Sequence, residues 1–212
     1  MAETVVLLHG LALRSPAMWP LSRRLAQAGF HCLRFDYGTL WGSPARAAER
    51  LAMKLYALQP GPVHLVAHSL GGLIAMQTLL EYQQLPPGRV VCLGSPLAGS
   101  SAARALHRRH VGWINGRSGP LLRSGLPMLP EGRQVAMLAG GKSLGLGRWF
   151  SDFDGVNDGT VAVWETRLPG LAAHRVLPLS HSGLLLAPVV AEHTAYFLHH
   201  GKLPERRRQP RA

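Results

Sequence analysis

The stretch VHLVAHSLGG, residues 63–72, places a serine between a run of apolar residues and two glycines. The residues from Val63 to Ala67 have the composition of a buried strand, and the apolar residues after Gly71 continue as a helix. A serine at such a strand-to-helix junction lies on a tight turn with strained backbone angles, so the residues two before and two after it must be small. Ala67 and Gly71 meet that requirement, and the stretch therefore predicts an exposed hydroxyl at Ser69.

Strand-like apolar runs alternate with helical segments on both sides of this junction. This alternation is typical of an α/β protein with a largely parallel sheet. Residues 94–131 are rich in Gly, Ser, Pro and Arg and follow no regular pattern beyond one short helix. The expected strands are 4–8, 30–35, 63–67, 89–93, 134–139 and 174–177, and the expected helices are 15–28, 44–59, 71–83, 102–107 and 184–199.

The length of 212 residues, with 47% hydrophobic and 16% charged residues, fits one globular domain. We expect this domain to span residues 1–200, followed by a basic tail at 201–212. The apolar runs are far shorter than the roughly 20 residues of a membrane span, and Glu3 replaces the basic start of a secretory signal. A cytoplasmic location is therefore expected. Cys32 and Cys92 lie in strand-like runs and are expected to be free and buried.

The formal net charge is +12. The tail GKLPERRRQPRA carries five Lys or Arg and one Glu, so it supplies +4 and leaves +8 on the rest of the chain. A basic surface attracts anionic lipid or nucleic acid, but basic residues interleaved with aromatic ones and nucleic-acid motifs are not evident, so nucleic acid is not an expected partner. We favour a solvated basic surface with a frayed tail, and weak association with an anionic membrane surface is the alternative.

Five motifs occur in this order along the chain: LLHGL, VAHSLGG, VVCLGSPLAGS, NDGTVAV and LSHSGLL. With them the chain resembles the α/β hydrolase superfamily, and in plan the small lipases and esterases of bacteria that lack a lid domain. The resemblance covers the chain except residues 100–150. It implies a minimal α/β hydrolase of about six mostly parallel strands flanked by helices, with no large cap domain, because the first two strands of larger members are missing. It also implies a triad in the order Ser, acid, His.

A serine hydroxyl becomes a nucleophile when a histidine takes its proton and an acid orients that histidine. His181 lies in LPLSHSGLL, a short polar loop between a strand and a helix, and we predict that it is the base. His174 begins a strand, and His193 lies within a helix, so structural roles are expected for both. The histidines that follow Ser69 with room for an acid are His110, His174, His181, His193, His199 and His200.

The acid is expected at the end of a strand between Ser69 and His181. Glu81 lies on the helix after the serine and Glu131 precedes a strand, so both point away from the site. Asp158 lies in VNDGTVAV, a tight turn that contains a glycine, and we predict that it is the acid, with Asp154 as the alternative. The acidic residues in this interval are Glu81, Glu131, Asp152, Asp154, Asp158 and Glu165.

Acyl transfer also needs hydrogen-bond donors for the developing oxyanion. One expected donor is the backbone N–H of Leu70, which follows the nucleophile, and the other is the N–H of Leu11, in the loop HGLALRS after the first strand. The side chain of His9 is expected to hold this loop. Asp36, in the FDYG loop, is expected to accept hydrogen bonds from a loop or a helix end.

Residues 100–130 are too few for a large cap, so we expect an open site or a small flap over it. Apolar residues of this segment are candidates for contact with an acyl chain, although ordinary loop packing explains them equally well. The candidates are Trp113, Leu121, Leu122, Leu126 and Met128.

The sequence thus predicts a serine hydrolase that cleaves carboxylic esters, of small molecules or lipids, through an acyl-enzyme, with Ser69, Asp158 and His181 as the triad. No cofactor and no metal site are predicted. An acyltransferase or thioesterase with the same triad is the first alternative, because the fold and triad do not choose the acyl acceptor. A catalytically silent binding protein is the second.

Overall fold

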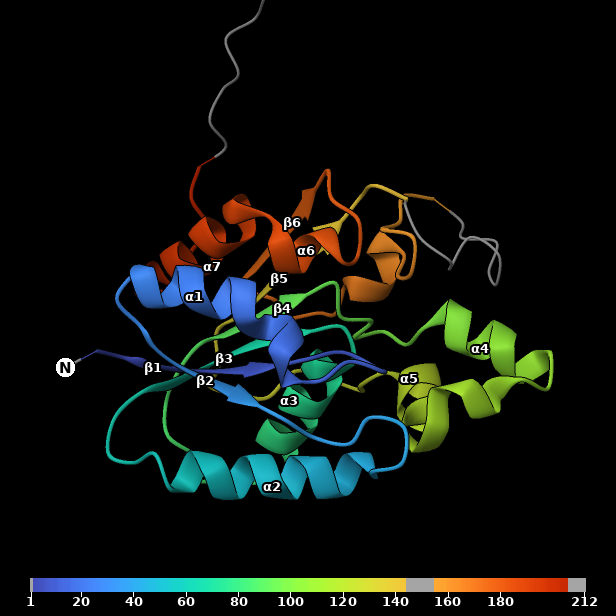
Figure 1. The fold of residues 1–212 in the computed structure, drawn as a ribbon, viewed down its shortest axis with the longest axis horizontal. Coiled ribbons are helices and arrows are strands. Elements are labelled where there is room, and N and C mark those ends of the chain that lie inside the picture. Colours follow the sequence, from blue (N-terminus) through green and yellow to red (C-terminus); the bar gives the residue numbers. More distant parts are fainter. Residues whose placement is uncertain (1, 144–154, 206–212) are drawn as a thin grey trace, which may run out of the picture.

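The computed structural model describes residues 2–143 and 155–205 of the chain. Its centre is a six-stranded parallel sheet in the order β2-β1-β3-β4-β5-β6 (Figure 1). Each predicted strand is present within one residue of its expected ends. The strands are β1 (Thr4–Leu8), β2 (His31–Phe35), β3 (Val63–His68), β4 (Val90–Leu93), β5 (Val135–Gly140) and β6 (Ala173–Leu177).

The strand order reverses between β1 and β3, which places a topological switch point at the carboxyl ends of these two strands. Ligands of open α/β sheets bind in the crevice outside such a point. Ser69 directly follows β3, and the loop from residue 9 directly follows β1. The fold therefore brings the two segments singled out in the sequence to one place.

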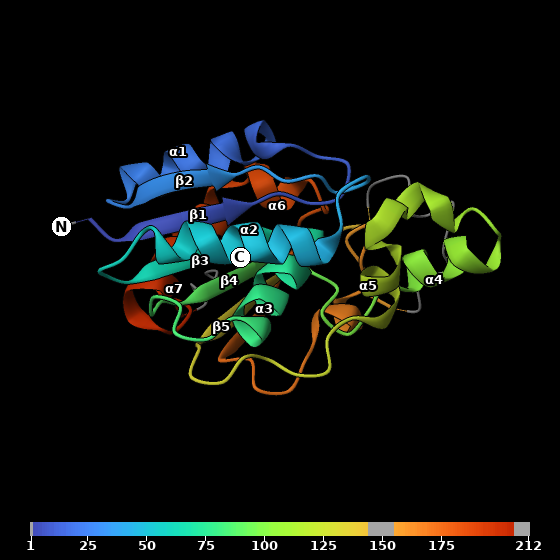
Figure 2. The same cartoon turned by 90° about the horizontal axis from the view of Figure 1, so that it is seen from below.

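Helices cover both faces of the sheet (Figures 1 and 2). One face packs against α1 (Trp19–Gln27), α6 (Gly183–Leu186) and α7 (Pro188–His200), and the other against α2 (Pro44–Tyr56) and α3 (Leu70–Glu81). Successive strand side chains point to opposite faces, so Val5 contributes to the first core and Val6 to the second. Because both faces are buried, the inner strands are largely apolar, with His64 and His68 of β3 as buried exceptions.

Proline explains two differences from the predicted helices. The helix expected from residue 15 starts as a 3-10 turn, η1 (Ser15–Met18), and α1 begins at Trp19, so that Pro20 lies in its first turn, where no N–H is needed. The single helix expected at 184–199 is divided into α6 and α7, because Pro188 lacks the N–H that would continue it. Pro188 instead starts α7.

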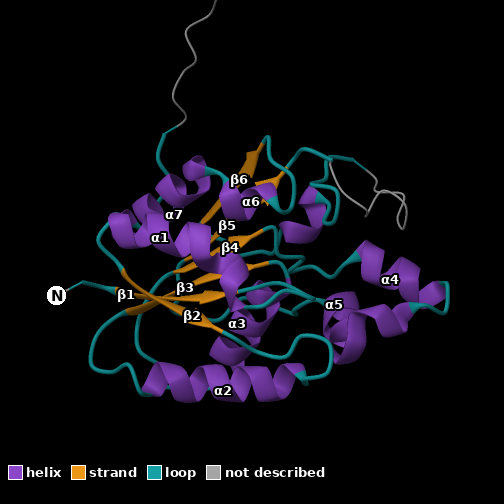
Figure 3. Ribbon diagram, viewed as in Figure 1, coloured by secondary structure: helices purple, strands orange, loops and turns teal. Residues whose placement is uncertain are grey.

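Residues 101–124 form three short helical elements where one was expected: α4 (Ser101–Arg108), η2 (Gly112–Ser118) and α5 (Gly119–Ser124). They gather beyond the carboxyl ends of the strands (Figure 3). Ser100 caps α4 by accepting a hydrogen bond from the Ala103 N–H at 3.2 Å. Gly116 has a φ of 55°, and a Cβ there would lie 2.2 Å from the Leu40 carbonyl oxygen. Only glycine therefore allows the backbone of η2 to lie this close to the loop at Leu40.

Both cysteines are free, as expected. Cys92 is buried, which raises the pKa of its thiol to about 12, whereas Cys32 is only half-buried. Among the described residues, no helix has the length and apolar character required to cross a membrane.

Candidate active site

Ser69 lies in the turn between β3 and α3, with φ 54° and ψ −122°, an uncommon conformation for a residue with a side chain. Its N–H donates to the Leu93 carbonyl at 2.9 Å, which ties the turn to β4. A Cβ at Gly71 would lie 2.7 Å from the His9 carbonyl oxygen and 2.9 Å from that of Leu8. The small residue that the sequence required at this position is therefore demanded by the backbone of β1.

Asp158 and His181, distant in sequence, lie in direct contact. The Asp158 Oδ2 is 2.7 Å from His181 Nδ1, and its Oδ1 accepts the N–H groups of Thr160 and Val161 at 2.9 and 2.7 Å. The carboxyl group is almost fully buried. Because a carboxylate only accepts hydrogen bonds, this contact assigns the His181 proton to Nδ1 and leaves a lone pair on Nε2.

The backbone around this pair holds both side chains in place. The His181 N–H donates to the Asp158 carbonyl at 3.0 Å. Gly94, which follows β4, has a φ of 55°, and a Cβ there would lie 3.1 Å from Asp158 Oδ2 and 3.2 Å from His181 Nδ1. Gly94 therefore leaves room for the pair, a role that the sequence analysis did not recognise.

His68 is a second residue that the sequence analysis missed, because only histidines after Ser69 were considered. It is buried, its ring lies 4.6 Å from the His181 ring, and its Nε2 lies 3.1 Å from the His181 carbonyl oxygen. Burial lowers the pKa of His68 well below 6.5, so the ring is neutral and donates through Nε2. The loop that carries His181 is thus held from two sides, by Asp158 and by His68. The signal available in the sequence was its position directly before Ser69.

Ser69, His68 and His181 line one cavity of about 820 Å³, a volume typical of small-molecule sites. Apart from these residues the wall is largely apolar, and no Lys, Arg, Asp or Glu of the described residues lines it. The site can therefore surround an uncharged apolar chain next to the serine. The apolar wall includes Leu13 and Pro16 near α1, Ala103 and Leu106 on α4, Leu122 on α5, and Leu185 on α6.

The predicted acyl contacts are mostly placed elsewhere. Leu122 lines the cavity, but Trp113, Leu121 and Met128 do not. Trp113 is 76% exposed and Met128 49% exposed, Leu121 packs against the core on the α2 and α3 face, and Leu126 is buried in that core. The reason is that much of the apolar wall is supplied by α4 and by residues near α1 and on α6, whose positions in space the sequence did not predict.

Both predicted oxyanion donors lie close to Ser69. Leu11 lines the cavity, and Leu70 is the first residue of α3, where backbone N–H groups have no partner within the helix. Neither amide donates a hydrogen bond to another of the described residues. A Cβ at Gly10 would lie 3.1 Å from Ser69 Cβ, so the loop after β1 rests directly against the serine.

His9 and Asp36 have the supporting positions expected from the sequence. The buried His9 ring stacks on Tyr37 at 4.4 Å, and the Tyr37 hydroxyl donates to the His9 carbonyl at 2.6 Å. Burial lowers the pKa of His9. Asp36 accepts the Ser15 N–H at 2.8 Å, and its hydrogen bond with Arg14 lowers its pKa to about 2.

Several of the other candidate acids and bases have structural partners, Glu131 and His110 are exposed and do not line the cavity, and two of the acids lie outside the described residues. Glu165 is buried and accepts the N–H groups of Ser101 and Ala162, and Glu81 accepts from Gln77. His174 bonds the Thr166 hydroxyl at 2.8 Å, in agreement with the structural role expected for it. Asp152 and Asp154 lie outside the described residues, so the alternative acid stays a prediction.

The fold and the site together define an α/β hydrolase. Residues 5–209 match the model of the alpha/beta hydrolase family, and the chain belongs to that family. Comparison with curated protein sequences finds no match.

Several solved structures share this fold. The chain is similar to the mature form of the Bacillus licheniformis lipase BlEst2, with a TM-score of 0.78 and 21% identity over 93% of this chain and 91% of that chain. It is similar to the metagenomic carboxyl esterase MGS0156, with a TM-score of 0.71 and 18% identity over 93% of this chain and 75% of the esterase chain. It is also similar to the pyrethroid hydrolase PytH, with a TM-score of 0.69 and 14% identity over 95% of this chain and 99% of the PytH chain.

Proposed function

We propose that the protein is a serine hydrolase of carboxylic esters, with Ser69 as nucleophile, His181 as base and Asp158 as acid. The observation that carries the proposal is the 2.7 Å contact between His181 and Asp158 beside an apolar cavity that Ser69 also lines. Family membership and the likeness in fold to a lipase, an esterase and a pyrethroid hydrolase support it.

In the first half-reaction, the Ser69 Oγ attacks the ester carbonyl carbon while His181 Nε2 takes the hydroxyl proton. The carbonyl oxygen becomes an oxyanion and accepts hydrogen bonds from the N–H groups of Leu11 and Leu70. When the tetrahedral intermediate collapses, the carbon–oxygen bond to the alcohol breaks and His181 returns the proton to the departing alcohol. Ser69 then carries the acyl group.

In the second half-reaction, water replaces the alcohol. His181 takes a proton from water, whose oxygen attacks the acyl carbon, and the bond to Ser69 Oγ breaks as His181 returns the proton to the serine. Asp158 keeps its charge and stabilises the imidazolium in both halves. The products are a carboxylic acid and the free enzyme.

The cavity favours an uncharged ester with an apolar acyl or alcohol group. No charged residue among those described lines the wall, so a carboxylate or phosphate on the substrate would lose its hydration without gaining a counter-ion. Apolar groups gain about 25 cal/mol for each Å² removed from water. Esters with aliphatic chains are therefore the expected substrates.

The decisive experiment compares wild type with Ser69→Ala on p-nitrophenyl esters of graded chain length. Ser124, exposed on α5, offers a matched control, Ser124→Ala, that should keep wild-type rates. A fluorophosphonate should label the wild type on Ser69, as located by mass spectrometry. Absence of both turnover and labelling in the wild type would exclude the proposal and favour a silent binding protein.

Product analysis separates hydrolysis from acyl transfer. The proposal expects free acid as the main product in the presence of an added alcohol or thiol. Predominant transfer to the added acceptor would replace the hydrolase assignment by an acyltransferase with the same triad.

A further inference from the structure

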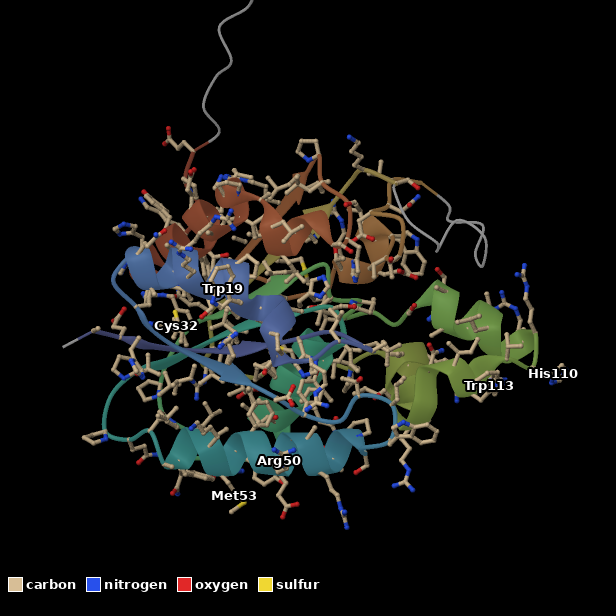
Figure 4. The ribbon with its side chains drawn as sticks, viewed as in Figure 1. Trp19, Cys32, Arg50, Met53, His110 and Trp113 are labelled. Atoms are coloured by element: carbon tan, nitrogen blue, oxygen red, sulfur yellow. The ribbon has the colours of Figure 1, made fainter. Side chains whose placement is uncertain are left out.

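The end of α4 and the η2 helix that follows carry exposed basic and apolar residues, which we call the arginine tip: Arg108, Arg109, Trp113, Ile114 and Arg117. All five side chains are exposed, Trp113 by 76% and Ile114 by 43%. Figure 4 shows Trp113, with His110 nearby, at the outer end of this helical segment, away from the sheet. The Trp113 indole is thus largely exposed to water, in a short stretch of chain that also carries three exposed arginines.

The charged residues of the arginine tip are all positive, and acidic residues are absent from the surrounding sequence. The chain contains no Asp or Glu between Glu81 and Glu131, a stretch that includes the whole tip. Within the described ranges, Arg108, Arg109 and Arg117 form no ion pair with a carboxylate. Their positive charge is therefore available to an anionic partner.

A second exposed tryptophan is tied to the same end of the molecule. Trp41 is 89% exposed in the loop before α2. The Arg117 N–H donates to the Leu40 carbonyl at 2.9 Å, and the Ser118 hydroxyl donates to the Thr39 carbonyl at 2.7 Å. These bonds hold the loop of Trp41 against η2, so aromatic and basic side chains come together here although the sequence analysis did not find them interleaved.

We propose that the arginine tip docks onto the surface of an anionic lipid bilayer. Indole rings favour the interface between headgroups and acyl chains, and guanidinium groups bind anionic headgroups. An acidic protein would use the arginines alone, and a nucleic acid would also stack a base on Trp113, but neither accounts for the exposed aliphatic Ile114 as a lipid surface does. The inner side of the same segment lines the cavity with Leu106 and Asn115, so docking would bring the cavity wall next to the lipid.

The test measures binding of the full chain to vesicles, without any ester, and so does not depend on the proposed function. The probes are vesicles of phosphatidylcholine with and without phosphatidylserine, separated by sedimentation. A triple variant removes the tip charges: Arg108→Gln, Arg109→Gln and Arg117→Gln. A matched control removes three exposed charges from other surfaces: Arg23→Gln, Lys54→Gln and Lys202→Gln.

The proposal expects wild type to bind only the vesicles that contain phosphatidylserine. The tip variant should bind on the order of 100-fold more weakly, since each basic residue near the surface contributes roughly fivefold, and the matched control should lose much less. Trp113→Ser should weaken binding without any change in charge. Brominated acyl chains should quench wild-type tryptophan fluorescence more than that of Trp113→Phe.

Other outcomes would overturn the proposal. Equal losses in the tip variant and the matched control would show that net charge alone governs binding. Tip-dependent binding to polyglutamate or to a DNA oligonucleotide, with vesicle binding unaffected by Trp113→Ser, would identify an acidic protein or a nucleic acid as the partner. Thermal unfolding of each variant establishes that the compared proteins are folded.

Discussion

Replacement of Asp158 by Asn tests the triad directly, because the new amide keeps the size of the side chain and removes its charge. Two unit charges about 4 Å apart, at an effective dielectric constant of about 20, attract each other by about 4 kcal/mol, which corresponds to about 1000-fold in rate. The Asn amide can also donate to His181 Nδ1, which would move the ring proton to Nε2 and block the base. We therefore expect kcat to fall by about 10³ to 10⁴.

Glu165 provides a matched control for burial. Like Asp158 it is fully buried and accepts two backbone N–H groups, but it faces Ser101 and Ala162 instead of a histidine. Glu165→Gln and Asp158→Asn should both lower the free energy of unfolding, by about 1–3 kcal/mol each, whereas only Asp158→Asn should lose turnover of p-nitrophenyl butyrate per folded molecule. Equal losses of turnover in both variants, or a larger loss in Asp154→Asn, would refute the assignment.

Three further predictions concern packing, selectivity and pH. Gly71→Ala should lower the free energy of unfolding by about 1–3 kcal/mol in urea titrations and kcat by about 100-fold, because its Cβ meets two carbonyl groups. Gly119→Ala should do neither, because the nearest atom to its Cβ is the end of the flexible Arg123 side chain at 3.2 Å, and the next, Asn115 Cβ, lies at an ordinary contact distance of 3.5 Å. Leu106→Trp should fill the cavity, so that kcat/KM falls at least about tenfold for long acyl chains but little for acetate, and an equal fall for both would contradict the assigned wall. Burial lowers the pKa of His9, His64 and His68 below 6.5, so the unfolded chain binds more protons below that pH. Stability should hold above about pH 6.5 and fall below it by up to about 1.4 kcal/mol per pH unit for each histidine, and urea midpoints that do not change between about pH 7.5 and about pH 5 would contradict this.

The strands were predictable because their burial on both faces leaves apolar runs such as Val90 to Leu93. Within residues 101–124, the helix expected at 102–107 is present as α4, but its placement in the fold and the elements η2 and α5 were not predicted, because they depend on distant contacts. The backbone of Gly116 has a positive φ where it lies against Leu40, and the Ser101 N–H at the start of α4 donates to Glu165, 64 residues later in the chain. Local sequence patterns contain no information about such partners.

In the candidate site, too, local patterns predict some residues, while the roles of others depend on distant contacts. Ser69, Asp158 and His181 each lie in a turn with a local signature, so they could be named without a structure. The wall of the cavity could not, because Leu106 and Leu185 are ordinary helical leucines until the fold places them beside Ser69. The role of His68 depends on the carbonyl of His181, which is 113 residues away.

The proposed reacting groups and the cavity wall are held by different parts of the fold. In the proposed mechanism the nucleophile and the oxyanion donors follow the central strands β1 and β3, and the base follows the edge strand β6. The backbone at Leu8 and His9 leaves no space for a larger residue at Gly71, and the side chains of Leu184, Asp158 and His181 leave none at Gly94. Part of the cavity wall belongs to α4 and α5, which contact η2 and one another, and α5 also contacts α3. Changes in that segment can alter the accepted chain or the docking surface while the spacing of the reacting groups stays fixed by the sheet. The proposed reacting groups and the surfaces proposed to recognise substrate and lipid therefore lie on different parts of the chain.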